Sequence, residues 1–208
     1  MLDVERLRSE YESKLELYKQ LAATVQFLIS REIQKRHIKT HSLPYRIKSF
    51  DSFLDKIRSK DAKDPFQEIM DIVGLRVVCL FRDDVKDVGD IVKEHFYIIE
   101  EDDKINSQDV TIFGYMSLHY KARLKDGQSG SYHEGMKDVP FEIQIRTIAQ
   151  DAWASISHHL GYKKESDIPT ELRRDFNALS GLFYVADTHF AMLKQELTKY
   201  FVDKASKE

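Results

Sequence analysis

Three polar side chains with complementary chemistry alternate along one short segment of the chain. Glu142, Gln144 and Arg146 stand at every second position of residues 139–147, and apolar residues stand between them. Strict alternation predicts a strand with one buried face, so the three polar groups share the other face. A solvated outer face is the ordinary explanation of such a pattern. However, a carboxylate, an amide and a guanidinium together are also what a site for phosphate and metal requires.

A second acid and an arginine accompany the most apolar segment. Residues 72–81 are β-branched and apolar, which predicts a central strand buried on both faces. Arg76 lies in its middle, and an arginine there needs a partner, either an ion pair or a phosphate. Asp71 precedes the strand and is ordinarily a turn residue. Paired with Glu142, however, Asp71 would supply two hard oxygen ligands, which is the usual protein share of a Mg²⁺ site.

A basic cluster precedes this strand. Arg46 and Lys48 alternate around Ile47, and Lys56 follows on the next segment. Such runs are usually solvated surface, but the alternation also allows both side chains to face one ligand. The chain has no Gly-x-x-x-x-Gly-Lys loop and no Gly-x-Gly-x-x-Gly motif, which excludes the two commonest nucleotide cradles.

Hydrophobic periodicity predicts the elements that position these residues. Apolar residues spaced by threes and fours predict one long helix over 1–40, which a loop at 41–44 ends. Further helices are predicted over 50–59, 84–95, 148–160 and 169–201, with a short one at Pro65, and strands over 72–81, 96–100, 117–124 and 139–147. A glycine-containing hairpin loop over 125–138 joins the last two strands. We therefore expect an α/β fold, a mixed β-sheet with flanking helices and a long helix at each end.

The bulk composition suits one soluble globular domain. The chain has 208 residues, 42% of them hydrophobic and 32% charged, and a formal net charge of −3. The acidic balance gives no global sign of nucleic-acid binding. No apolar run approaches the roughly 18 residues of a membrane span, and the charged start Met-Leu-Asp-Val-Glu does not resemble a signal peptide. We expect a cytoplasmic protein. The single cysteine, Cys79, excludes an intrachain disulfide.

Four segments, taken in order, resemble the synthetase domain of the RelA/SpoT family, which includes the small alarmone synthetases. They are Tyr-Arg-Ile-Lys-Ser at 45–49, Asp-Ile-Val-Gly-Leu-Arg-Val-Val at 71–78, Gly-Tyr-Met-Ser-Leu-His-Tyr at 114–120, and Phe-Glu-Ile-Gln-Ile-Arg-Thr at 141–147, which continues to His-His-Leu-Gly-Tyr-Lys at 158–163. The resemblance implies a nucleotidyltransferase-like fold and a GTP diphosphokinase. Such an enzyme moves the β,γ-pyrophosphate of ATP to the 3′-hydroxyl of GDP or GTP, makes (p)ppGpp and releases AMP. One domain over 1–208 is implied, with a catalytic core at about 42–165, an N-terminal helix at 1–40 and a C-terminal helix at 168–203.

The resemblance also implies roles for individual residues. Asp71 and Glu142 match the catalytic acids that hold Mg²⁺. The ATP-binding positions are matched by basic residues: Arg46, Lys48, Lys56 and Arg76. Tyr115 matches the tyrosine that stacks on the acceptor guanine, and the other acceptor-side positions are matched by His119, Gln144, Arg146, His158 and Lys163. The segment before Gly114 departs from the family pattern, so acceptor recognition is less defined than donor chemistry.

Two alternatives remain open at the level of sequence. Some small members of the superfamily are toxins that pyrophosphorylate the 3′ end of tRNA, and basic residues at 121, 123 and 125 fit that target. The other alternative is a binding module with a dead site, although both proposed acids and the basic residues are present.

The C-terminal helix predicts self-association. Its apolar stripe from Leu172 to Leu197 is expected to face the core, while Leu182, Tyr184 and Val185 widen the apolar arc. A helix that is apolar over so wide an arc usually buries a second face. We expect a homo-oligomer, and the resemblance favours a tetramer. The alternative is that the N-terminal helix covers the second face within one chain.

Overall fold

A six-stranded mixed sheet organises the protein. The computed structural model describes residues 3–103, 117–127, 134–160 and 168–206. The strand order is β1-β3-β6-β5-β4, and β2 also pairs with β3. β3 and β6 are parallel and the other pairs are antiparallel, which confirms the predicted mixed sheet. The strands are β1 Thr40–Ser42, β2 Tyr45–Ile47, β3 Val73–Cys79, β4 Phe96–Asp103, β5 Leu118–Leu124 and β6 Phe141–Thr147.

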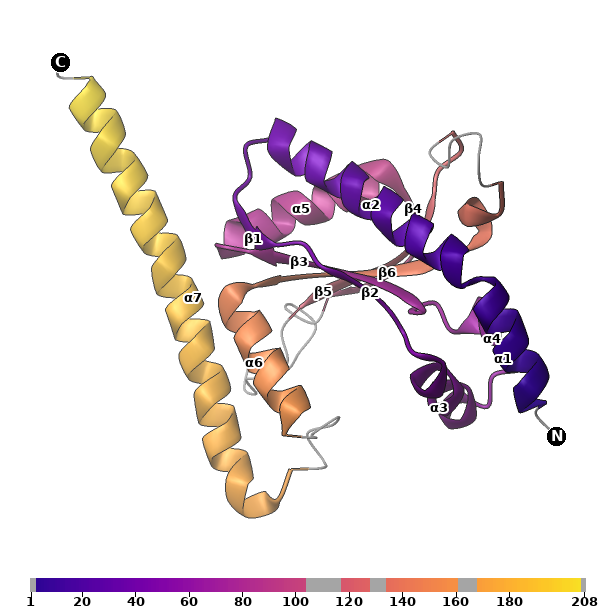
Figure 1. The fold of residues 1–208 in the computed structure, drawn as a ribbon. Helices are drawn as coiled ribbons and strands as arrows, with labels where there is room; N and C mark the ends of the chain where they lie inside the picture. The colour runs from indigo at the N-terminus through magenta and orange to yellow at the C-terminus, as the bar shows by residue number, and fades with distance from the viewer. Residues whose placement is uncertain (1–2, 104–116, 128–133, 161–167, 207–208) are drawn as a thin grey trace.

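Two helices cover one face of the sheet. α2 (Leu15–Lys35) and α5 (Arg82–His95) both lie on the same side of the strands in Figure 1. Their apolar faces supply buried residues such as Leu21, Val25 and Ile91, which belong to one core cluster with the strand residues Val77 and Ile143. Burial of this apolar face is the main force that fixes which side of each strand points inward.

The opposite face of the sheet carries the polar side chains. α3 (Phe50–Lys60) and α6 (Ile148–His159) lie on that side, towards opposite ends of the sheet (Figure 1). α4 (Pro65–Glu68) leads into β3, and a 3₁₀ turn, η1 (Glu134–Asp138), precedes β6. The polar alternation of β5 and β6 therefore faces a space bordered by helices.

α7 (Thr170–Ala205) stands at one edge of the molecule. It packs against α6 and α5, and its C-terminal end projects beyond the rest of the fold (Figure 1). Among the described helices, we find none whose length and apolar character would suit a membrane crossing.

The predicted single helix over 1–40 is wrong. The structure has two helices, α1 (Val4–Ser13) and α2, with Lys14 between them. The Lys14 amide donates to the carbonyl of Tyr11 at 3.1 Å, a tighter turn than an α-helix makes. The Tyr11 ring packs against Phe50 and Phe53 of α3, and its hydroxyl donates to the carbonyl of Lys48. These contacts with residues distant in the sequence hold α1 on α3. The spacing of apolar residues along residues 1–40 does not predict them.

The predicted loop at 41–44 is also incomplete. α2 ends at Lys35, His37 adopts a left-handed φ of 56°, and the chain then forms β1 and β2 along one edge of β3. Each of these strands has three residues and mixed polarity, so neither shows a period of two in the sequence. The remaining predicted helices and strands are present, with ends that differ by a few residues. Residues 128–133 of the predicted hairpin loop lie outside the described residues.

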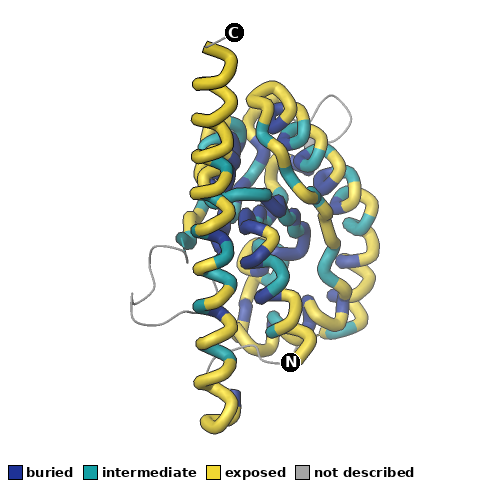
Figure 2. Tube along the Cα trace, turned by 90° about the vertical axis from the view of Figure 1, so that its left-hand side faces the viewer, coloured by how far each residue is buried: buried dark blue, intermediate teal, exposed yellow. Residues whose placement is uncertain are grey.

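The predicted core-facing stripe of the C-terminal helix is wrong for most of its residues, although Phe176 and Phe183 do pack against Trp153 of α6. Ser180 and Asp187 are the buried residues of α7, whereas Leu172, Leu193 and Leu197 are each about half exposed. Figure 2 shows the helix as largely exposed along its length. α7 meets the body of the protein mainly through α5 and α6, with a further hydrogen bond from Thr147 at the end of β6, so most of its apolar surface has no partner among the described residues of the chain.

Candidate active site

A polar cleft of about 280 Å³ opens on the helix-bordered face of the sheet. Acids and bases from several elements line it: Arg46, Lys56, Asp71, Glu100, Asp102, His119, Lys121, Glu142 and Gln144. Strand register explains their convergence, because directly opposite residues of paired strands share a face. His119 stands opposite Gln144, Lys121 opposite Glu142, and Asp102 opposite His119. Six of the residues predicted from sequence therefore meet in one place.

Asp71 is held by two lysines at the rim of this cleft. Its Oδ2 accepts from the ammonium group of Lys48 at 3.1 Å and from that of Lys56. Burial by itself would raise the pKa of Asp71, but the hydrogen bond from Lys56 and the charges of both lysines outweigh it and lower the pKa. Asp71 is therefore an anion at neutral pH. Its other oxygen, Oδ1, is buried and has no hydrogen-bond partner among the described residues.

Glu142 accepts a hydrogen bond on each of its oxygens. His119 donates through Nδ1 to Oε1 at 3.1 Å, and Gln144 donates through Nε2 to Oε2 at 2.9 Å. Burial would raise the pKa of Glu142, but the hydrogen bond and charge of His119, with smaller effects from Gln144 and Lys56, lower it to about 2. The sheet thus presents Glu142 as a fixed, charged carboxylate.

Ser117 orients the histidine that contacts Glu142. Its hydroxyl lies 2.5 Å from Nε2 of His119. A carboxylate only accepts hydrogen bonds, so Nδ1 of His119 carries the proton that faces Glu142. The contacts follow the order serine, histidine, acid that nucleophilic hydrolases use. Ser117 is 0% exposed, however, and a nucleophile must reach its substrate, so Ser117 serves as a support.

Arg76 and Arg146 share one acid on the neighbouring helix. Asp151 Oδ1 lies 3.0 Å from Nη1 of Arg76 and 3.4 Å from Nη1 of Arg146. The sequence left open whether Arg76 pairs with an acid or with a phosphate, and in the structure it pairs with an acid, Asp151. Neither arginine is among the residues that line the cleft, but Arg76 stands opposite Gln144 in the β3–β6 register and so shares its face of the sheet.

The structure does not bring three further predicted site residues into the described part of the cleft. Tyr115 and Lys163 lie outside the described residues. His158 is exposed near the C-terminal end of α6 and does not line the cleft.

Sequence reasoning missed the acids of β4 and the supporting groups. Asp102 lines the cleft because β4 runs to Asp103, beyond the predicted end at residue 100, and Glu100, the last residue of the predicted strand, lines it as well. The end of β4 is a run of acidic residues, and a prediction based on hydrophobic residues therefore stops short of it. Ser117 belongs to the polar alternation of residues 117–124, so the sequence pattern could have singled it out. No sequence pattern indicates which residues pair with Asp151.

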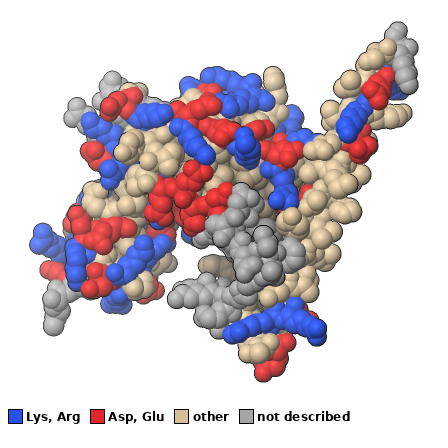
Figure 3. Space-filling view, turned by 180° about the vertical axis from the view of Figure 1, so that it is seen from behind, with Lys and Arg blue, Asp and Glu red and all other residues tan. Residues whose placement is uncertain are grey.

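The basic residues at 121, 123 and 125 are engaged with other parts of the protein. Lys121 pairs with Glu100 at 2.7 Å, Arg123 donates to Gln67 at 3.1 Å, and Lys125 donates to a backbone carbonyl. Seen from behind, acidic side chains gather near the centre of the molecule with basic ones around them (Figure 3). No described feature therefore favours an acceptor stem over a nucleotide.

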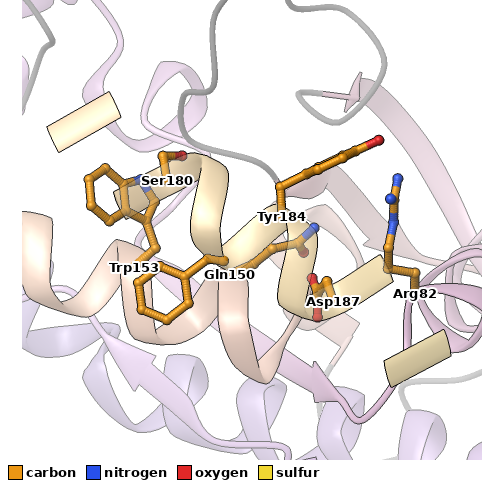
Figure 4. Close-up of a pocket in the computed structure, with 7 residues that line it drawn as sticks. Arg82, Gln150, Trp153, Ser180, Tyr184 and Asp187 are labelled. Atoms are coloured by element: carbon orange, nitrogen blue, oxygen red, sulfur yellow. The ribbon is translucent and has the colours of Figure 1, made fainter. Parts of the chain in front are cut away.

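A separate cavity lies in the seam between α6 and α7. Figure 4 shows Trp153 and Gln150 of α6 facing Ser180, Tyr184 and Asp187 of α7. Its volume is about 10 Å³, room for one water at most. Asp187 accepts a hydrogen bond from the Thr147 hydroxyl at 2.5 Å, which fixes the junction between β6 and α6 against α7. A cavity of this volume is too small for a nucleotide.

One family model covers the part of the chain that forms the cleft. A family model described as the region found in RelA and SpoT proteins matches residues 45–167, which include the cleft. GTP pyrophosphokinase YwaC of Bacillus subtilis is 31% identical over 158 residues, covering 73% of this chain and 72% of that protein.

Solved structures match the fold over nearly its whole length. A GTP pyrophosphokinase family protein from Streptococcus pneumoniae superposes with a TM-score of 0.76 at 28% identity, covering 92% of this chain and 96% of that one. Small alarmone synthetase 1 of Bacillus subtilis, bound to its product pppGpp, gives a TM-score of 0.72 at 26% identity, with coverage of 91% and 99%.

Proposed function

The chain belongs to the family of RelA and SpoT proteins, and from this premise we propose that it is a GTP pyrophosphokinase. It moves the β,γ-pyrophosphate of ATP to the 3′-hydroxyl of GDP or GTP, which yields (p)ppGpp and AMP. The observation that carries the proposal is the meeting of Asp71 and Glu142 with basic side chains in one cleft. The product pppGpp on a structural relative supports a guanine nucleotide as the acceptor. We propose that residues 1–208 act as one synthetase domain in the cytoplasm, where ATP is available.

The donor phosphates bind among the cations around Asp71. Arg46 and Lys56 line the cleft, and Lys48 reaches Asp71 from its edge. Charge-assisted hydrogen bonds from these groups and from Arg76 match the oxygens of a triphosphate. Phosphoryl-type transfer depends mainly on such positioning and on neutralising charge.

Asp71 and Glu142 fit a magnesium ion. Both are charged carboxylates that line the cleft, and the buried Oδ1 of Asp71 has no hydrogen-bond partner among the described residues. Hard oxygens of this kind are the ligands that Mg²⁺ takes beside substrate phosphates. When bound, the ion neutralises charge on the phosphate oxygens.

Glu142 is the base for the acceptor hydroxyl. It takes the proton of the 3′-hydroxyl while the 3′-oxygen bonds to the β-phosphorus of ATP and the bond to AMP breaks. Its pKa of about 2 makes it a weak base while His119 donates to it. The acceptor's 3′-hydroxyl donates to Glu142 as its proton is transferred, and the carboxylate is held in place for this step by the hydrogen bond from Gln144. His119 and Gln144 then face the acceptor from the cleft wall.

One assay tests the function and its alternatives together. The protein is incubated with ATP labelled in its β-phosphate and with GDP, GTP, ATP or bulk tRNA as acceptor. We expect label in the guanine nucleotides and release of AMP. Label that appears only in tRNA would support the toxin activity, and no transfer to any acceptor would support a binding module.

Tyr115→Ala should raise the KM for the guanine acceptor more than the KM for ATP. We propose that the tyrosine stacks on guanine alone, and a base–aromatic stack contributes on the order of 1–3 kcal/mol. Initial rates measured with each substrate varied in turn give both constants. Equal changes in the two constants would contradict the stacking role.

We propose that the protein is a homo-oligomer, with a tetramer favoured, and that α7 contributes to the interface. Leu182 is 63% exposed and Val185 is 49% exposed, and large residues without polar atoms continue along the helix to Val202. Figure 3 shows uncharged atoms over much of the length of α7, with charged side chains at its projecting end. Exposed apolar surface of this extent usually marks an interface.

Light scattering at micromolar concentration measures the assembly. We expect a multiple of the 24.4 kDa chain mass, and Leu182→Glu with Val185→Glu should shift it towards one chain. Glu16→Lys, a charge change at an exposed position of α2, serves as the control. A mass of one chain for the wild-type protein would refute the assembly, and a multimer that survives both substitutions would place the interface elsewhere.

A further inference from the structure

Asp151 occupies a well-defined position next to the cleft. β6 ends at Thr147 and α6 begins at Ile148 without an intervening loop. Thr147 caps the helix by a reciprocal capping box with Gln150, and Asp187 of α7 holds the Thr147 hydroxyl. Asp151 follows in the first turn of α6, where the helix dipole favours a negative charge.

One oxygen of Asp151 lies between two guanidinium groups. Its Oδ1 is 3.0 Å from Nη1 of Arg76 on β3 and 3.4 Å from Nη1 of Arg146 on β6. The Arg146 side chain is 2% exposed, so its charge has been withdrawn from water and depends on the groups around it. Asp151 therefore sets where two cations from neighbouring strands can lie.

An ion pair and two hydrogen bonds connect Asp151 to Glu142 through Arg146 and Gln144. Arg146 donates through Nη2 to Oε1 of Gln144, and Gln144 donates through Nε2 to Oε2 of Glu142. Arginine is only a donor and an ionised carboxylate is only an acceptor. The amide of Gln144 can satisfy both neighbours in one orientation only, with its oxygen towards Arg146 and its nitrogen towards Glu142.

We propose that Asp151 is a positioning residue of the transfer reaction. By holding Arg146, it fixes the amide of Gln144 and thereby the direction of the Glu142 carboxylate. By holding Arg76, it keeps a second guanidinium on the donor side of the sheet. The inference rests on the proposed function of the cleft, and it adds a residue outside the cleft to the machinery.

A purely structural ion pair makes a different prediction. The side chains of Asp151 and Arg76 are 25% and 33% exposed, and partly exposed ion pairs contribute little to stability. Arg146, by contrast, is 2% exposed and would lose a partner for its buried charge. A purely structural role therefore predicts a lower melting temperature and unchanged kinetic constants in the folded protein. A positioning role instead predicts a loss of kcat in protein that is still fully folded at the assay temperature.

Asp151→Asn provides the test, because it removes the charge and keeps the shape. We expect kcat to fall about 10-fold, since small misplacements of catalytic groups have effects of this order or larger. The KM for ATP should rise about 3-fold through Arg76, and the KM for the acceptor should stay within about twofold. Asp90→Asn is the matched control, because Asp90 pairs with Lys86 on the outer side of α5 and should leave all three constants unchanged.

A double-mutant cycle with Gln144→Ala identifies the route. If Asp151 acts on Glu142 through Gln144, Asp151→Asn should cause no further loss of kcat in the Gln144→Ala background. Its effect on the KM for ATP should persist there, because that effect passes through Arg76. A kcat within twofold of wild type for Asp151→Asn, or an undiminished loss in the Gln144→Ala background, would overturn the proposal.

A second variant and a binding measurement test the role of Asp151 if the first variant is not folded or the protein shows no turnover. Should Asp151→Asn fail to fold, Asp151→Glu replaces it, since it retains the charge but shifts the carboxylate by one methylene; an unchanged kcat in that variant would overturn the proposal. The affinity for a non-hydrolysable ATP analogue reports on Arg76 without turnover. If wild-type protein transfers pyrophosphate to no acceptor, the proposed function fails, whereas a weaker analogue affinity in Asp151→Asn would still support the positioning of Arg76.

Discussion

Glu142→Gln should lower kcat by at least about 10²-fold, the low end for the loss of a general base. The change removes a base and a metal ligand at once, while an amide occupies nearly the same volume. His119 can still donate to the amide oxygen, and the strand on both sides of residue 142 is buried through Phe141 and Ile143. We therefore expect a folded protein with little turnover. AMP release under saturating substrates measures the loss, and circular dichroism with a melting curve measures the fold.

The matched control is Glu94→Gln. Glu94 is 55% exposed on α5, where it pairs with Arg36, so the same chemical change there should leave kcat unaltered. An active Glu142→Gln variant with normal kinetics would place the base elsewhere. A variant that loses activity and its melting transition together would show a structural role, and Glu142→Asp, which keeps the charge, would then separate charge from fold.

Removal of divalent metal should abolish transfer altogether, and Mg²⁺ should restore it. Without the ion, Asp71 and Glu142 would face the negative oxygens of a triphosphate in one cleft, and like charges at close range repel strongly in a partly buried site. Asp71→Asn should therefore raise the Mg²⁺ concentration needed for half-maximal rate and lower kcat by at least about 10²-fold. Rates of AMP release across a Mg²⁺ titration, with and without chelator, measure both effects.

Asp61→Asn provides the control for this second prediction. Asp61 is 86% exposed at the end of α3 and pairs only across the surface with Lys63, so its removal should leave the Mg²⁺ requirement unchanged. Full activity in excess chelator would contradict the metal site. An Asp71→Asn variant with a normal Mg²⁺ titration would remove Asp71 from it and leave Glu142 as the remaining acid of the proposal.

The residues of the candidate site could be predicted from the sequence because side chains along a strand alternate between its two faces. The alternation around Glu142, Gln144 and Arg146 assigned them to one face, and in the structure Glu142 and Gln144 line the cleft while Arg146 is buried beside it. The sequence also predicted the buried strand after Asp71, because a run of β-branched apolar residues is typical of a strand. Local patterns of this kind depend only on neighbours along the chain, so the sequence by itself predicted the mixed sheet, its central strands and the acids that mark the site.

Tertiary structure decided which of these groups touch. The break at Lys14 depends on Tyr11 packing against α3, and the edge strands β1 and β2 exist only because β3 offers them a partner. The pairing of Asp71 with Lys48 and Lys56, and the place of Asp151 between two arginines, join residues that are between 5 and 75 positions apart. Hydrogen bonds and ion pairs act over a few ångströms of space. A pattern along the chain therefore predicts which face a side chain takes, and only the folded sheet determines which partner it meets there.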